Sequence, residues 1–197
     1  VKNLNASYHP EIFMREGVPP LIDAIKLDAK KFIALMVTFF TPIYVEACKN
    51  LNVSWKYLDA VIDVLGIAPA DKHHLSVEEA VSNYEKLFRE REKFFEQYSP
   101  LLENYLVNEL FLNIYPFKFP EKSITRNFFV YAITYKIFEL IIFSATLKGF
   151  SGKEELLATV DFFTMNIDHK NELQNEIFDL FKDEKDLFPF MTILPDK

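Results

Sequence analysis

A long apolar run, FFVYAITYKIFELIIFSATL at residues 128–147, restricts the possible folds of this chain more than any other feature. The run is long enough to cross a bilayer as a helix. Lys136 and Glu139 lie near its middle, however, and a charged side chain costs about 2.5–3.5 kcal/mol at the centre of a membrane span. Because they are three residues apart, they can pair on one helix face. We therefore predict a buried central helix at 124–148 and no membrane span.

The rest of the chain also favours helices. It has 4 Gly among 197 residues, and strand-and-turn folds use glycine where φ is positive. No segment alternates apolar and polar residues for long, so little or no sheet is expected. We predict an all-α fold, an irregular helical bundle of about 6–8 helices around the central apolar helix. One helical domain should span 1–197, with an irregular arm at 1–18.

Caps, glycines and prolines place the other helices. We expect them at about 21–50, 54–66, 76–98, 101–115 and 153–169, the first kinked at Pro42 and the last extending as far as 182. The capping-box patterns SVEE (76–79) and SGKE (151–154) open two of these helices, and Ser99-Pro100 separates the third from the fourth. The apolar tail at 187–194 must dock on the fold. It would serve a dimer interface as readily as a core, so a homodimer is an open expectation.

Charge and cysteine content exclude several classes of protein. The net charge is −7, whereas a nucleic-acid-binding protein should have a basic face. Cys48 is the single cysteine, so a secreted disulfide scaffold is excluded and a cytoplasmic location is expected. His73 and His74 point apart on an extended loop, so no metal site is predicted. The sequence contains no nucleophile elbow, dinucleotide fingerprint or phosphate-binding loop.

The helix at 101–115 poses a question, because it places an amide on its apolar stripe. Leu101, Tyr105, Asn108 and Leu112 fall within a narrow arc at about 100° per residue. A buried amide without a hydrogen bond costs about 1–3 kcal/mol. We expect Asn108 to bind a neighbouring backbone and so fix how the helix packs. Alternatively, Asn104 and Asn108 line a ligand or partner groove, with Tyr105 at its edge.

Two further candidates come from the charged residues of the other helices. Lys136 and Glu139 are expected to form a buried structural ion pair, with a pocket-lining role as the alternative. His169 follows Asp168 in the last helix and is expected to be partly exposed.

Four stretches together resemble a known family. They are LLENYLVNELFLNIYPF (101–117), FFVYAITYKIFELIIFSATLKGFS (128–151), MNIDHKNELQNEIFDLF (165–181) and FPFMTIL (188–194). They are similar to the C-terminal helical half of the flagellin lysine N-methylase family, over residues 90–194. The resemblance implies pocket or interface roles for Glu103, Asn104, Tyr105, Asn108, Tyr131 and His169, with no chemical step assigned to any of them.

The resemblance also implies cofactors and a partner. Members of the family are taken to methylate flagellin lysines with S-adenosylmethionine, and to carry a cysteine-rich segment that holds an iron–sulfur cluster. Cys48 alone cannot ligate a cluster, which needs several thiolates. We therefore expect no cofactor in this chain, which starts with Val and reads as the C-terminal part of a longer protein. Catalysis by this chain alone is left open.

Two functions follow from this reading. The first is a helical part of a flagellin lysine N-methylase-like protein that contributes to binding of the protein substrate or to the active-site scaffold. The alternative is a non-enzymatic sensor or interaction domain with an apolar ligand cavity, suggested by the 21 Phe and by Lys136 and Glu139.

Overall fold

The computed structural model describes residues 25–38, 56–67, 77–112, 118–119, 122–168, 172–181 and 191–193. In chain order the elements are β1 (Ile25–Leu27), a helix described over 29–38, α4 (Lys56–Leu65), α5 (Val77–Arg89), α6 (Arg91–Leu112), α7 (Ile124–Leu147), α8 (Lys153–Phe163), the π-helix η1 (Thr164–Asp168), α9 (Glu172–Leu180) and β2 (Met191–Ile193). The predicted all-α bundle is confirmed, with one small two-stranded ladder in addition.

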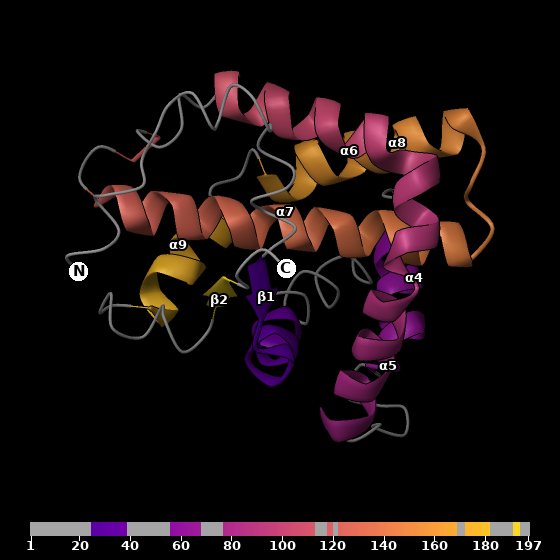
Figure 1. Ribbon diagram of the computed structural model, residues 1–197, viewed down its shortest axis with the longest axis horizontal. Helices are drawn as coiled ribbons and strands as arrows, with labels where there is room; N and C mark the ends of the chain where they lie inside the picture. Colours follow the sequence, from indigo (N-terminus) through magenta and orange to yellow (C-terminus); the bar gives the residue numbers. More distant parts are fainter. Residues whose placement is uncertain are drawn as a thin grey trace.

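The central helix α7 forms the axis of the fold, and α4, α6, α8 and α9 pack around it (Figure 1). Every side chain from Phe129 to Ala145 is buried, because a helix that is apolar all round must be covered on all sides. In the described part of the chain, α7 alone has the length and composition of a membrane span, yet 94% of its apolar window is buried inside the protein. The prediction of a buried central helix is confirmed.

Both ends of α7 have regular caps. The Ser123 hydroxyl accepts a hydrogen bond from the Arg126 N–H at 3.2 Å, which satisfies one of the free donors of the first turn. At the other end Gly149 has a φ of 90°, and the Phe150 N–H reaches back to the Ala145 carbonyl at 2.9 Å. This is a Schellman motif, for which glycine is the favoured residue. Gly66, with a φ of 71°, ends α4 as predicted.

Two predicted helix boundaries are wrong. The break between α5 and α6 lies at Glu90, and Ser99-Pro100 lies inside α6. Pro100 removes a backbone donor and crowds the preceding turn, in agreement with the bent ribbon of α6 (Figure 1). In α8 the cap is one residue later than predicted, because the Gly152 N–H donates to the Glu155 carboxylate at 3.2 Å.

Two predicted long helices are divided. In the helix predicted from Lys153 onward, the described residues form α8, the π-helix η1 and α9, so the α-helix that starts at Lys153 ends at Phe163. Within the expected helix at 21–50, residues 25–27 form strand β1 and residues 29–38 are helical. The predicted arm at 1–18, the kink at Pro42, and the caps Ser54 and Ser76 lie outside the described residues.

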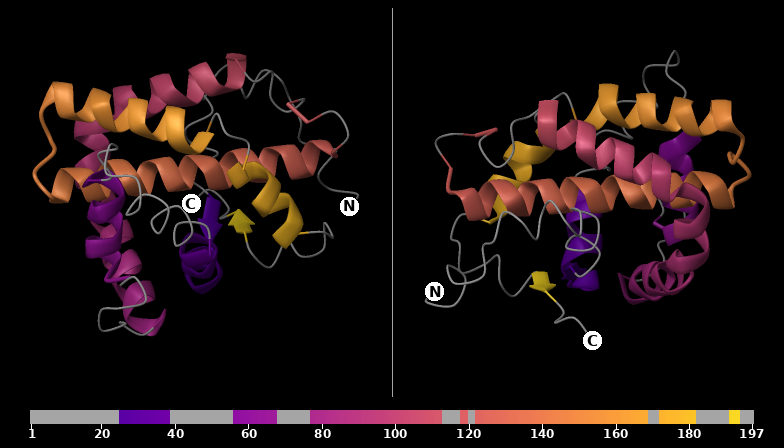
Figure 2. Two further views of the ribbon diagram at one scale, coloured as in Figure 1. Left: turned by 180° about the vertical axis from the view of Figure 1, so that it is seen from behind. Right: turned by 45° about the horizontal axis from the view of Figure 1, so that its top comes forward.

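A short ribbon joins segments from opposite ends of the sequence. Strands β1 and β2 pair antiparallel, with Ile25 opposite Ile193, Lys26 opposite Thr192 and Leu27 opposite Met191. In the left view of Figure 2, β1 and β2 lie below α7. The prediction that the apolar tail docks on the fold is confirmed for residues 191–193.

Candidate functional site

The predicted pocket residues of α6 lie on different faces of the helix. Tyr105 is buried, whereas Glu103, Asn104 and Asn108 are exposed. Leu112, which should have shared the buried stripe with Asn108, is 75% exposed. The prediction that Asn108 lies on the inner face is therefore wrong. The buried stripe consists of Tyr98, Leu102, Tyr105 and Leu106. It shares Tyr105 with the predicted stripe but is rotated about the helix axis, away from Asn108 and Leu112.

Tyr105 belongs to an aromatic cluster that joins three helices. Its ring is stacked on Phe138 of α7, with centroids 3.9 Å apart, and meets Phe163 of α8 edge-on at 5.7 Å. The rings of Phe138 and Phe163 also touch, at 5.1 Å. Each such aromatic pair contributes about 0.5–1.5 kcal/mol beyond the area it buries. Tyr105 therefore fixes α6 and α8 on the same side of α7.

Tyr131 makes a second contact between α6 and α7. Its buried hydroxyl donates to the Leu106 carbonyl at 2.9 Å. A hydrogen bond of this kind contributes about 0.5–1.5 kcal/mol, and it satisfies a phenol that is otherwise removed from water. Tyr105 and Tyr131 are thus brought together at the α6–α7 contact, on the face opposite Asn108.

Lys136 and Glu139 form the buried ion pair predicted from their spacing. The Lys136 Nζ atom lies 3.0 Å from Glu139 Oε2, and the side chains are 1% and 4% exposed. The ammonium also lies 5.7 Å from the centre of the Phe88 ring and 5.6 Å from that of Tyr135. Taking two charges out of water costs several kcal/mol per ion. The close pairing and the aromatic faces offset this cost, so each partner depends on the other.

Asn127 is a buried amide that bonds a neighbouring backbone, which is the role that the sequence suggested for Asn108. It is 1% exposed, its Nδ2 donates to the Phe119 carbonyl at 3.0 Å, and its Oδ1 accepts from the Phe119 N–H at 3.0 Å. A further bond runs from Nδ2 to the Ser123 carbonyl at 3.1 Å. The available signal was an amide at the end of the polar first turn of α7, where the helix becomes apolar on all sides, next to a connection whose backbone needs partners.

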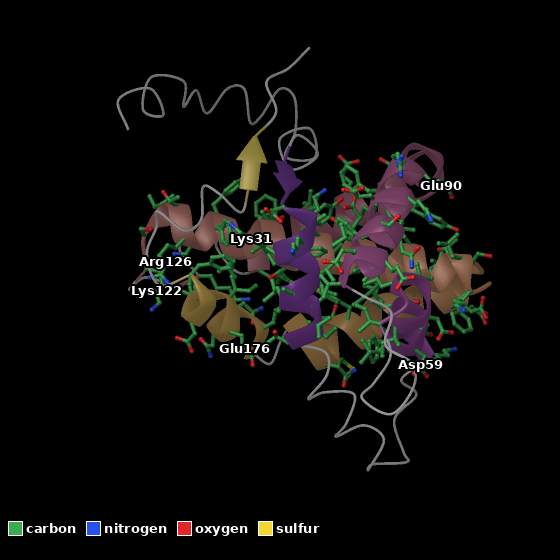
Figure 3. All side chains as sticks on the ribbon, turned by 90° about the horizontal axis from the view of Figure 1, so that it is seen from below. Lys31, Asp59, Glu90, Lys122, Arg126 and Glu176 are labelled. Carbon is green, nitrogen blue, oxygen red and sulfur yellow. The ribbon has the colours of Figure 1, made fainter. Side chains whose placement is uncertain are left out.

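Arg126 was also missed, and it supports the end of α9. Its Nη2 donates to the carbonyls of Phe178 and Phe181 at 2.9 and 2.8 Å. The guanidinium lies 5.3 Å from the Phe178 ring, and Lys122 Nζ lies 5.2 Å from the same ring. Figure 3 shows Lys122 and Arg126 together beside α9. Cations stabilise a helix C-terminus, where carbonyls are free, so this basic pair has a structural role.

The remaining candidates provide no metal or cofactor centre in the part of the chain that is described. No group of three or more His, Cys, Asp or Glu side chains occurs among those residues. Gly66, Gly149 and Gly152 all lie at helix ends. His169, His73, His74 and Cys48 lie outside the described residues.

A comparison with protein families identifies the family of this chain. The sequence model of the FliB lysine N-methylase C-terminal domain matches residues 13–194. The chain belongs to this family. The resemblance inferred from residues 90–194 is therefore confirmed, and the match to the family model begins at residue 13. No curated protein and no solved structure matches the chain.

In this FliB C-terminal domain the six residues named from the resemblance all lie within the matched range. The structure separates the five that it describes into Tyr105 and Tyr131, which join α6 to α7, and Glu103, Asn104 and Asn108, which face outward. His169 lies outside the described residues. Membership of the family does not favour the alternative of a sensor domain with an apolar cavity.

Proposed function

We propose that this chain is the helical part of a flagellin lysine N-methylase-like protein and that it binds the protein substrate beside the active site. The match to the FliB lysine N-methylase C-terminal domain over residues 13–194 carries the proposal. The net charge of −7 supports it, because an acidic surface attracts a lysine-bearing partner and repels other acidic proteins. The cytoplasm is the proposed compartment.

The residues of this chain do not fit an iron–sulfur cluster. A cluster is held by several thiolates, and the chain contains one cysteine. The described glycines end or begin helices, so they offer no glycine-rich loop for a nucleotide-like methyl donor. We infer that the cluster and the S-adenosylmethionine site belong to another part of a longer parent protein. No step of methyl transfer is assigned to this chain.

The proposal is tested by deleting codons 1–197 of this chain from the gene in its own cells. Flagellin is then purified and its lysines are examined by mass spectrometry. We expect N-methyl-lysine to disappear from flagellin, and to return when the unmodified gene is restored. Flagellin methylated to the same extent in the deletion strain would overturn the proposed function.

A further inference from the structure

The outward side of α6 exposes large apolar side chains. Phe111 is 80% exposed, Leu112 75% and Val107 37%. Because Val107 and Phe111 are one turn apart, they lie above each other on one face. Glu103, Asn104 and Asn108 are exposed on the same side of the helix. A contiguous exposed apolar patch with polar residues at its rim is typical of a protein interaction site.

The neighbouring segment formed by α8 and η1 also exposes apolar side chains. Leu157 is 49% exposed and Met165 71%, and Asp161 between them is exposed. Both views in Figure 2 place α6 and α8 on the same side of α7, and the contact between Tyr105 and Phe163 holds them together. Met165 lies in a π-helix, a rare geometry that is frequent at functional sites.

We call the exposed side chains of α6 between Glu103 and Leu112, and of α8 and η1 between Lys153 and Met165, the outer face. Each helix buries its other side against α7, so these side chains point away from the core. The other large apolar residues that are exposed in the described part of the chain, Val77, Ile124 and Leu147, each stand alone at one end of a helix, whereas Phe111 and Leu112 lie with Val107 on one side of α6. Single exposed apolar residues of that kind are normal.

The charges of the outer face indicate which partner it takes. Among its described side chains, Glu103, Glu154 and Asp161 are acidic and Lys153 is basic. A second copy of the chain would bring the same acidic surface and another net charge of −7, so self-association through this face is opposed by repulsion. A partner with basic residues beside an apolar stripe complements it.

We propose that the outer face docks a lysine-bearing amphipathic segment of the protein substrate. The apolar side chains of that segment pack on Phe111, Leu112 and Met165, and its lysines lie near Glu103 and Asp161. This inference rests on the proposed function and deepens it, because it states where the substrate is held and by which chemistry. A segment held here by its apolar stripe presents its other lysines to the rest of the parent protein.

The apolar part of the inference is tested by titrating the full 197-residue chain with purified flagellin in a calorimeter. Phe111→Ser and Met165→Ser should each raise Kd about tenfold or more, since each removes the burial of a large apolar side chain at the contact. Leu147→Ser is the matched control, because Leu147 is a 47% exposed apolar residue at the end of α7. Its Kd should stay within about twofold of that of the unmodified chain.

The charged part is tested by varying the salt concentration in the same titration. Binding by the unmodified chain should weaken as salt rises, because screening reduces the attraction between carboxylates and lysines. Glu103→Gln and Asp161→Asn should weaken binding at low salt and flatten this dependence. Glu85→Gln removes an exposed carboxylate from α5 and should leave the dependence unchanged. Circular dichroism verifies that each variant is folded.

The outcomes separate the inference from the proposed function. If the unmodified chain binds flagellin and the outer-face variants bind equally well, the inference is overturned and the proposed function stands. If the unmodified chain does not bind flagellin, the substrate-binding role and the inference fall together. A homodimer in ultracentrifugation that Phe111→Ser abolishes would assign the outer face to a second copy and overturn the inference.

Discussion

Asn127 satisfies the backbone of the connection that enters α7. It bonds the N–H and the carbonyl of Phe119 with its amide and adds the carbonyl of Ser123. Phe119 in turn packs edge-on against Phe178, with ring centroids 5.1 Å apart. A buried peptide group without a partner costs about 1–3 kcal/mol. At the scale of single residues, the Asn127 amide therefore holds the connection at Phe119 against both α7 and α9.

This predicts a contrast between two asparagines. Asn127→Ala leaves both polar groups of Phe119 without this partner, so we expect the free energy of unfolding to fall by about 2–3 kcal/mol. Asn108→Ala changes an exposed side chain and should shift it by no more than about 0.5 kcal/mol. Urea denaturation followed by circular dichroism measures both. Equal losses in the two variants would contradict the assigned roles.

The sequence located some buried polar residues and not others, for a physical reason. Lys136 and Glu139 lie within a run that is apolar on every side, so no rotation of that helix could expose them. The helix that contains Asn108 is different. Apolar residues of α6 point in several directions, so the sequence allowed either of two stripes to be the buried one. Only the partner surface on α7, through Tyr131 and Phe138, decides which stripe is buried.

At the scale of elements, helix ends were predictable where glycine marks them and less so elsewhere. Gly66 and Gly149 end α4 and α7 with positive φ, as their positions in the sequence indicated. Pro100 signalled a boundary but lies inside α6, since contacts made by both halves of the helix can outweigh a local penalty of about 3 kcal/mol. The π-helix η1 interrupts a pattern that is helical throughout, and no local residue marks it.

Gly149 provides a test of the capping argument. Gly149→Ala puts a side chain on a residue with a φ of 90°, although nothing lies within 4 Å of the added Cβ atom. The cost is therefore backbone strain rather than a clash, and we expect a loss of about 1–2 kcal/mol in the free energy of unfolding. Gly149→Asn should lose less, because Asn tolerates this conformation. Thermal or urea unfolding checks the order, and an alanine variant as stable as the unmodified chain would contradict it.

At the scale of the whole molecule, the β1–β2 ribbon brings together residues 25–27 and 191–193. Neither segment shows the alternation that predicts a strand, and three-residue strands are too short to carry it. The pairing is a tertiary contact between distant segments, so local patterns could not predict it. They predicted only that the apolar tail would dock. The ribbon therefore ties residues 25–27 to residues 191–193.

The pairing register predicts a specific cross-link. In a Cys48→Ser background, Lys26→Cys with Thr192→Cys places two thiols on directly opposite residues, within the range that a disulfide can bridge. We expect oxidation to join them, seen as faster migration on a non-reducing gel, and to raise stability by up to about 5 kcal/mol because the closed loop is long. Lys26→Cys with Met191→Cys is the matched control, since a shift of one residue turns the second thiol to the other face of the ribbon. If that pair cross-links as readily, the register is not the one described, and Lys26 does not lie opposite Thr192.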